Sequence, residues 1–511
     1  MAPLTTLPAR LAFSALTLVL LAACAVGPDY EVPEFDAPAS WSQPAGGGLA
    51  AGFGEHVSWW EGLGDPKLSE LVERALLRNL DLREAFVRLD KARALRGVAA
   101  GERWPSIDAR GSYEHREESQ NTPFGAFSSR TNIHALGLDA AWELDLWGRV
   151  RRAVEASERD LDASAADVRA VAVAIAAEVA RAYVDRAAFE RRITIALTNV
   201  DLQERTLALV RSRQEAGLVG DRDVAQGDTN VESTRSRVPL LEAGAAAARH
   251  RLAVLIGLAP GALEDELAAA PAVPRAPAEV VVGVPADLLR RRPDVVAAER
   301  RYAAEVARIG VAQGDRYPRF ALGGTLGLAS DGAANLFEGD SKVAGIGPSL
   351  RWSLFDGGRL KQRVIAQEAR AEAAQIGWER TVLLALEEAE NALTRVVREQ
   401  SRAAALERAA TQARRAVELA QTQYREGISD FRAVLDSERV VAGLENELAI
   451  SNAAITTNLI ALYKAMGGGF ASPAASPETD DSSSVAVASF GSPARVSESL
   501  AHSHPQNARP R

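Results

Sequence analysis

The side chains that could carry out chemistry are few and widely spaced in this 511-residue chain. It has six histidines and one cysteine, and none of them falls into the HExxH or Cys/His spacings that hold a metal ion. There is no GxxxxGK(S/T) phosphate loop and no GxSxG nucleophile elbow. No acid–base or nucleophile pair can be assembled either. The sequence therefore predicts a protein that is not an enzyme and that needs no cofactor or metal.

The single cysteine, Cys24, predicts a covalent modification instead. An apolar run of the kind found in secretory signal peptides precedes it, which assigns residues 1–23 to a signal peptide. The run ends in Leu21-Ala22-Ala23-Cys24, which resembles the lipobox of bacterial lipoproteins. We therefore expect Cys24 to be acylated and to begin a lipid-anchored segment at 24–65. A plain secretory signal with an incidental cysteine is the alternative.

The composition points to long helices rather than to a compact enzyme. Ala, Leu, Val, Arg and Glu dominate, and aromatic residues make up only 5% of the chain. The 59 Lys and Arg are interspersed with 68 Asp and Glu, which gives a formal net charge of -9. Because no block of positive charge stands out, we do not expect nucleic-acid binding. No later segment has enough consecutive apolar residues for a transmembrane helix.

Two halves of the chain match each other at a nearly constant offset. Trp142-Glu-Leu-Asp-Leu-Trp-Gly-Arg149 aligns with Trp352-Ser-Leu-Phe-Asp-Gly-Gly-Arg359 at an offset of 210, and Gly217 aligns with Gly427 at the same offset. Each half predicts a helix, two strands, a very long helix and a returning helix. The first repeat, the linker and the second repeat cover residues 66–270, 271–284 and 285–466.

Apolar residues recur at alternating steps of four and three residues along the long segments. In the first half this track includes Leu161, Ala165, Val168 and Ala172. Such a heptad pattern predicts paired helices, and about 65 residues of helix would span on the order of 100 Å. We expect glycines to cap the outgoing helices, and Ser429 or Asp430 to cap the next helix. The long helices are expected at about 148–215, 223–256, 358–425 and 430–465.

Four shorter segments alternate between apolar and polar residues, as Ile107 and Ala109 do with Asp108 and Arg110. Period two predicts strands with one apolar face, and about ten residues suffice for a tilted strand of a membrane barrel. A half-buried sheet in a soluble domain would alternate in the same way. Four strands cannot close a barrel, so membrane strands would have to be shared between chains. The strands are expected at about 106–117, 132–145, 319–329 and 342–355.

Several stretches resemble signatures of the TolC-like outer-membrane efflux factors, specifically the NodT/OprM-type lipoprotein branch of RND-type efflux systems. They are Cys24-Ala-Val-Gly-Pro-Asp-Tyr30, Trp59-Trp60, Pro285-Ala-Asp-Leu-Leu-Arg-Arg-Arg-Pro-Asp294, and Tyr424 to Asp436. The resemblance covers residues 24–467. It implies a mainly α fold with a small β part, built on the duplicated helix-strand-strand-helix plan. Three chains would form one twelve-stranded transmembrane β-barrel, continued by a long periplasmic α-helical barrel.

The resemblance also implies a function and partners. The chain would be the passive exit duct of a tripartite efflux system for drugs, metals or other small molecules. A homotrimer, anchored in outer-membrane lipid and extending into the periplasm, would work with a periplasmic adaptor and an inner-membrane efflux pump. A periplasmic adaptor lipoprotein with coiled-coil hairpins is the alternative, and a purely structural coiled-coil lipoprotein is a third. Neither alternative explains two equivalent hairpins together with four strands.

The resemblance assigns roles to residues near the helix turns. A periplasmic gate would involve Tyr424, whose hydroxyl we expect to help close the mouth, and Asp436, which could otherwise be a solvated carboxylate. Arg432 stands where some members carry an apolar constriction residue, and it could pair with Asp436 one helical turn away. The helix-hairpin tips expected to contact the adaptor include Gly217, Leu218, Asp223, Gly427 and Ile428. The Gly-, Ser- and Pro-rich segment at 467–511 predicts a disordered tail.

Overall fold

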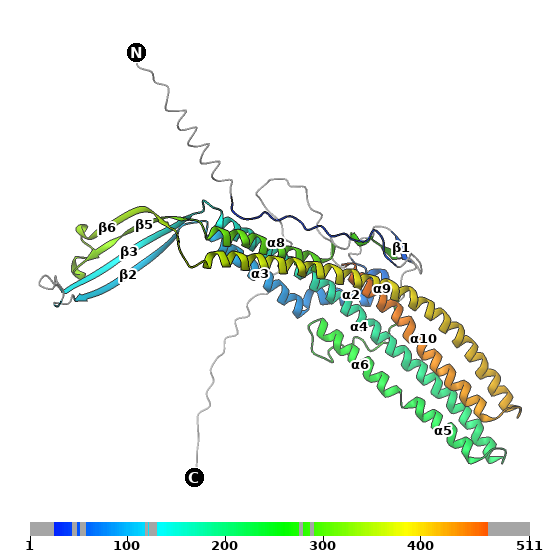
Figure 1. The fold of residues 1–511 in the computed structure, drawn as a ribbon. Coiled ribbons are helices and arrows are strands. Elements are labelled where there is room, and N and C mark those ends of the chain that lie inside the picture. Colours follow the sequence, from blue (N-terminus) through cyan, green and yellow to red (C-terminus); the bar gives the residue numbers. More distant parts are fainter. Residues whose placement is uncertain are drawn as a thin grey trace, which may run out of the picture. The chain divides into compact units, whose positions relative to one another are not determined.

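The computed structural model describes residues 25–42, 49–51, 58–117, 121, 130–274, 280–286 and 291–468 (Figure 1). Cys24, the signal segment expected at 1–23 and all but the first two residues of the expected tail lie outside these ranges. The described residues are mostly helical and include a small antiparallel sheet.

Four strands form that sheet in the order β2-β3-β5-β6, with every neighbouring pair antiparallel. Their bounds are β2 Ser106–Glu117, β3 Arg130–Leu144, β5 Arg319–Ser330 and β6 Lys342–Arg351. Each half of the chain thus contributes one strand pair, and β3 joins β5 across the two halves. The expected end of the fourth strand at residue 355 is wrong. Arg351 pairs with Arg319, the first residue of β5, so the residues after Arg351 extend beyond β5 and pair with no strand in the described part of the chain.

Two helices of 67 residues each follow the strand pairs: α4 (Arg149–Glu215) and α9 (Arg359–Arg425). At 1.5 Å per residue each is about 100 Å long. Both begin after a glycine with positive φ, Gly148 at 78° and Gly358 at 85°. The Asp145 carboxylate accepts hydrogen bonds from the first backbone N–H groups of α4, as Asp356 does ahead of α9. Negative charge at a helix N-terminus is stabilising.

The returning helix of the first half is not one helix, as expected for 223–256, but two: α5 (Asp221–Arg235) and α6 (Val238–Leu255). The cause is Pro239, which lacks an N–H group and whose ring clashes with a carbonyl one turn earlier. Position 449 of the second half, at the 210-residue offset, holds alanine, and α10 (Phe431–Ala465) runs unbroken.

The remaining helices pack around the long ones. Helix α4 contacts α2, α3, α5, α6, α8 and α10, while α9 contacts α8 and α10. The largest buried cluster includes Trp59, which stacks on Tyr463 with 5.2 Å between ring centroids. A short parallel pair joins β1 to β4, and the sequence did not predict it. The bounds of these elements are β1 Leu49–Ala51, α2 Pro66–Arg78, α3 Leu80–Gly101, β4 Val280–Val282 and α8 Pro293–Gly314.

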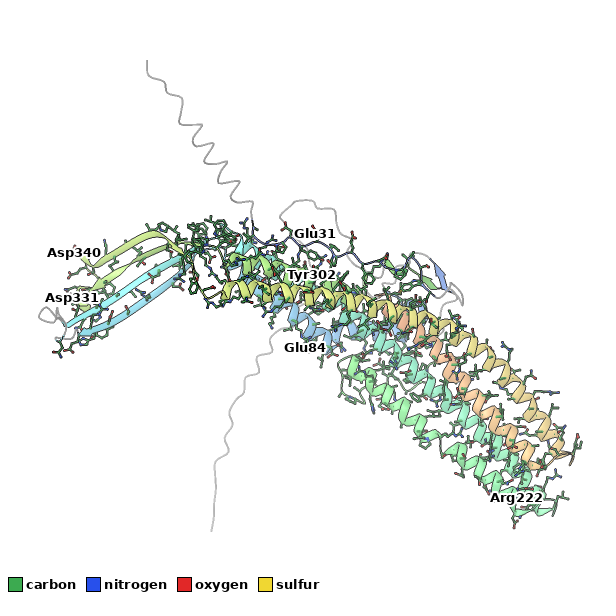
Figure 2. All side chains as sticks on the ribbon, in the orientation of Figure 1. Glu31, Glu84, Arg222, Tyr302, Asp331 and Asp340 are labelled. Atoms are coloured by element: carbon green, nitrogen blue, oxygen red, sulfur yellow. The ribbon has the colours of Figure 1, made fainter. Side chains whose placement is uncertain are left out.

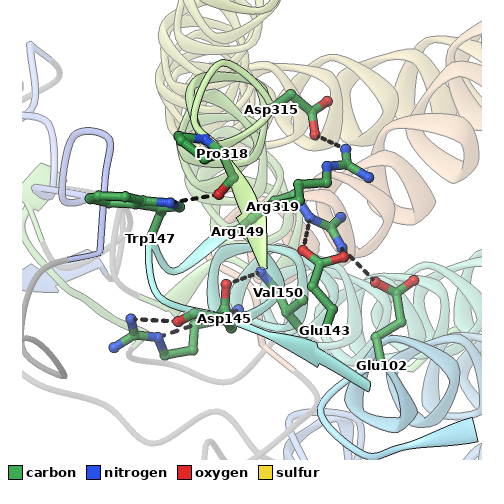
Figure 3. Close-up of polar contacts among 10 residues, drawn as sticks. Glu102, Glu143, Asp145, Trp147, Arg149, Val150, Asp315, Pro318 and Arg319 are labelled. Carbon is green, nitrogen blue, oxygen red and sulfur yellow. Dashed lines mark hydrogen bonds and ion pairs between the residues drawn. The ribbon is translucent and has the colours of Figure 1, made fainter. Parts of the chain in front are cut away.

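The junction between sheet and helices is held by polar contacts (Figure 3). Arg149 at the start of α4 donates to Glu143 at the end of β3, at 3.0 and 3.1 Å. The Trp147 indole Nε1 donates to the carbonyl oxygen of Pro318 at 2.8 Å, which ties the first half to the second just ahead of β5. These contacts fix where the sheet sits on the long helices.

Candidate functional site

The two hairpin tips, α4–α5 and α9–α10, have the same geometry at equivalent positions. Gly217 and Gly427 adopt φ of 71° and 76°, the left-handed conformation expected of glycines that cap a helix. After each glycine, a backbone N–H reaches back to the preceding helix: Leu218 to the Arg213 carbonyl at 2.9 Å, and Ile428 to the Gln423 carbonyl at 2.8 Å. Leu218 is 66% exposed and Ile428 70% exposed. Each tip therefore presents an aliphatic side chain to its surroundings.

Charged side chains surround these tips. Arg222 and Asp223 lie in the first turn of α5 and Asp430 precedes α10, where its carboxylate accepts from the Ala433 N–H at 3.2 Å. Figure 2 shows Arg222 at the end of the helices far from the strands. Of the two capping candidates, Ser429 or Asp430, the structure selects Asp430.

Tyr424 is buried where the two hairpins meet. The Arg213 guanidinium lies 4.7 Å from the centroid of its ring, and Phe431 packs against it at 5.5 Å. Arg213 also donates to the Tyr424 carbonyl oxygen. Burial raises the pKa of the Tyr424 phenol, Arg213 lowers it and Asp223 raises it. Among the described residues the phenol oxygen has no hydrogen-bond partner, so within this chain the ring, rather than the hydroxyl, makes the contacts.

Asp436 and Arg432 lie on the exposed side of α10. Within the described part of the chain they form no ion pair with each other, although they are four residues apart. Tyr424, buried against Arg213, and Asp436, open to solvent, are therefore in different environments. A contact that the exposed pair makes in an assembly would come from outside this chain.

A buried carboxylate that the sequence analysis missed lies deeper in the same helices. Glu438 is 1% exposed, and its partners are Thr206 at 2.7 Å, Asn230 at 3.2 Å and Gln421 at 3.3 Å. These four residues, the Glu438 cluster, come from α10, α4, α5 and α9. The apolar track of α10 held the signal. Counting back from Val441 in steps of three and four reaches Glu438 and then Val434.

The strand register gathers apolar side chains on one face of the sheet. Across the strands, Leu138 pairs with Leu326, whose partner on β6 is Ala344, and Gly324 pairs with Ile346. The exposed large apolar residues of this face are Ile107, Tyr113, Leu136, Leu138, Trp142, Leu326, Ile346 and Leu350. An uncovered apolar surface of this extent marks contact with lipid or with another protein.

The opposite face of the sheet is polar. The Thr325 hydroxyl donates to Asp139 at 2.9 Å, and Arg110 lies 3.7 Å from the same carboxylate. The predicted separation into an apolar and a polar face is confirmed by this register. Adjacent residues such as Thr325 and Leu326 therefore lie on opposite faces of the sheet, Thr325 on the polar face and Leu326 on the apolar face.

Two helices also keep exposed apolar faces. Helix α3 contacts α4 and α2, and α9 contacts α8 and α10. On their other sides, large apolar side chains remain exposed: Phe86, Val87, Leu95 and Val98 on α3, and Ile365, Ile376, Leu383 and Leu384 on α9. The uncovered faces of these helices are available for another chain.

Comparison with known proteins identifies the family. The sequence profile of the outer membrane efflux proteins matches residues 71–258 and 284–468, one match in each half. The chain belongs to the outer membrane efflux protein family. It is 32% identical over 431 residues to nodulation protein T of Rhizobium leguminosarum bv. trifolii, covering 84% of this chain and 91% of that protein. It is 30% identical over 468 residues to the outer membrane protein OprJ of Pseudomonas aeruginosa, covering 89% and 95%.

The fold agrees with this assignment. The solved outer-membrane channel OprN superposes with a TM-score of 0.83 and 36% identity, over 88% of this chain and 100% of that one. This outer-membrane efflux protein is therefore a channel, and the adaptor alternative is not favoured. Its family consists of efflux channels, not enzymes.

The described residues hold neither a membrane-spanning helix nor a cluster of metal ligands. No helix there combines the length and the apolar composition needed to cross a bilayer. In the same part of the chain, no group of three His, Cys, Asp or Glu side chains is placed to bind a metal ion.

Proposed function

We propose that three copies of this efflux protein share one transmembrane β-barrel and form the passive exit duct of a tripartite efflux system. The observation that carries the proposal is the continuous apolar face of the four-stranded sheet, whose outer strands β2 and β6 have one neighbour each. In lipid, the unpaired backbone groups of these strands would be too costly to leave unsatisfied. Pairing β2 of one chain with β6 of the next removes both edges.

The size of the assembly rests on the resemblance to the TolC-like efflux factors. Three chains with four strands each give twelve strands, which is within the range of outer-membrane barrels. The uncovered faces of α3 and α9 would pack between neighbouring chains and continue the wall below the barrel. With α4 and α9 each about 100 Å long, such a wall would extend far into the periplasm.

The hairpin tips are the proposed contact with a periplasmic adaptor, which connects the duct to an inner-membrane pump. Leu218 and Ile428, exposed at equivalent turns, would offer each adaptor hairpin an apolar contact beside Gly217, Gly427 and Asp223. Tyr424, Arg432 and Asp436 would form the gate. Three copies of Asp436 around a narrow mouth would attract cations. Small molecules would pass without being recognised, which fits a duct driven by its partner.

Native mass measurement and planar-bilayer recording of the purified full chain test this proposal. We expect a trimer that conducts and prefers cations. Replacing Asp436 with alanine should weaken that preference and lower blockade by multivalent cations, because it removes the ring of charge. A stable monomer with a conducting pore would refute the shared barrel. Unchanged selectivity in Asp436→Ala would show that Asp436 is a solvated carboxylate with no part in the gate.

We also propose that Cys24 carries a lipid anchor, on the strength of the lipobox resemblance. The described segment after it supports a fixed attachment point. Val26 N–H donates to the Trp147 carbonyl at 2.9 Å, in the segment that connects β3 to α4. Cys24→Ser should therefore lose palmitate labelling completely while trimers still form, since the barrel strands are unchanged. Cys24→Ser protein that still incorporates labelled palmitate would contradict the assignment.

A further inference from the structure

The Glu438 cluster joins all four helices of the two hairpins through one carboxylate. Glu438 Oε1 accepts from the Thr206 hydroxyl and the Gln421 amide, and Oε2 accepts from the Asn230 amide. Gln421 also donates to the Thr206 hydroxyl oxygen at 3.2 Å. The contact from α10 to α4 and α5 crosses from the second hairpin to the first. Separating the hairpins would break the hydrogen bonds from Thr206 and Asn230 to Glu438 and would expose the carboxylate to water.

The partners of the carboxylate are neutral groups. A buried ionised carboxylate is costly unless charge and hydrogen bonds compensate for the lost water. Here only hydrogen bonds compensate, because Thr206, Asn230 and Gln421 carry no charge. Burial accordingly raises the pKa of Glu438, while the three hydrogen bonds act in the opposite direction. Neighbouring positions of the same buried track, Val434 and Val441, hold apolar side chains, so a glutamate is the unusual residue at this position.

One charged side chain touches the cluster, and the neighbouring acidic residues form ion pairs outside it. Arg439, on α10 itself, donates to Asn230 Oδ1 at 3.2 Å and so touches the cluster through that amide. The acidic residues next along the three partner helices pair with arginines at the surface: Glu204 with Arg235, Asp228 with Arg211, and Glu418 with Arg415. None of these ion pairs includes Glu438.

We propose that the Glu438 cluster is the junction at which the two hairpins separate when the tip opens, and that its buried charge keeps the closed packing weak. This inference rests on the proposed channel function and adds a positioning residue to its gate. Glu438 acts through the helices that carry Tyr424 and Asp436. Opening hydrates the carboxylate, which recovers the free energy that burial of the charge costs.

The sign of the pH dependence follows from the raised pKa. A carboxyl group whose pKa is raised in the buried state keeps its proton there to a higher pH than in water. Protonation therefore stabilises the closed junction. This stabilisation is complete below the ordinary pKa of a glutamate, 4.5, and is lost as the pH rises through the raised pKa of the buried carboxyl group. The closed-to-open ratio should change by about tenfold for each unit between the buried and the hydrated pKa.

Glu438→Gln tests the proposal in the full chain. The amide carries no charge and keeps the size of the side chain and one acceptor oxygen for Thr206 and Gln421. Its N–H₂ group takes the place of the oxygen that accepts from Asn230, whose amide can rotate to offer its own oxygen. We expect a lower resting conductance than wild type at neutral pH, and loss of the rise with pH that the proposal predicts for wild type. Glu447→Gln is the matched control, because Glu447 is an exposed carboxylate on the same helix that pairs with Arg402. The control should behave as wild type.

Hydrogen exchange at the tip backbone gives a second measurement on the same proteins that does not depend on conductance. Slower exchange in Glu438→Gln than in wild type and Glu447→Gln would support the weak junction. Slower exchange in proteins that do not conduct at all would refute the proposed channel but support the junction. A carboxylate that only holds the helices together predicts the reverse: Glu438→Gln would exchange faster and conduct more. That result, or no difference among the three proteins, would overturn the inference.

Discussion

Leu326→Arg should abolish assembly of the channel in the outer membrane. Leu326 is 64% exposed on the apolar face and lies within β5, paired with Leu138 of β3. An arginine facing lipid near the middle of the bilayer costs about 2–4 kcal/mol in each chain. Three chains in one barrel would each carry that cost, so we expect almost complete loss of trimer from outer-membrane fractions. Gel separation of unheated samples from those fractions measures the trimer.

Thr325→Arg is the control for that experiment. It places the same side chain one residue earlier on the same strand, and period two turns it to the polar face. There it would lie beside the Asp139 carboxylate, to which Thr325 now donates at 2.9 Å. We expect trimers at the wild-type level. If both variants assembled equally well, the apolar face would not contact lipid, and the sheet would have to be covered by protein instead.

The architecture was predictable from the sequence to the extent that it rests on local periodicity. Heptad spacing located α4 and α9 to within a residue, and glycine spacing located both turns, because helix period and positive φ are properties of short segments. The two errors in element bounds have different causes. Pro239 breaks the helix locally and is visible in the sequence, whereas the end of β6 depends on where β5 begins, at a distance of 32 residues along the chain.

The site was less predictable, because its contacts join segments that are far apart in the sequence. The resemblance pointed to Tyr424, but nothing near Tyr424 in the sequence indicates that Arg213 lies over its ring. Glu438 is a similar case. A glutamate on an apolar track is usually a solvated residue at the edge of a seam, and only the four-helix arrangement shows that it is enclosed. The strand order β2-β3-β5-β6 was also beyond the sequence pattern, since alternation identifies faces but not neighbours.

The role proposed for Tyr424 in the gate depends on which of its atoms make contacts. Alignment with family signatures identifies a residue, but which atoms of that residue make contacts depends on the packing around it. For Tyr424 the expected group was the hydroxyl, and the structure gives that oxygen no partner among the described residues. The ring is instead enclosed between Arg213 of the first hairpin and Phe431 of the second. Removal of the hydroxyl alone would therefore leave both ring contacts in place.

Tyr424→Ala should raise the resting conductance of the channel strongly, whereas Tyr424→Phe should leave it near that of wild type. Truncating a buried aromatic ring to alanine costs about 3–5 kcal/mol of packing. The change also removes the surface on which the Arg213 guanidinium lies, a cation–π contact of about 0.5–2 kcal/mol. Phenylalanine keeps the ring and both contacts. Planar-bilayer recordings of the resting channel, without adaptor, compare the three proteins.

The outcome that would contradict this prediction is informative about the assembly. If Tyr424→Phe opened the channel as far as Tyr424→Ala, the hydroxyl would have to bond to a group outside this chain. The neighbouring copy could then supply that group, and the gate would be an interchain contact. If neither variant changed the conductance, the ring would only stabilise the hairpin turn, and closure would depend on groups deeper in the helices. The Glu438 cluster lies there, and because Arg213 and Tyr424 are not part of it, the two sets of variants distinguish these possibilities.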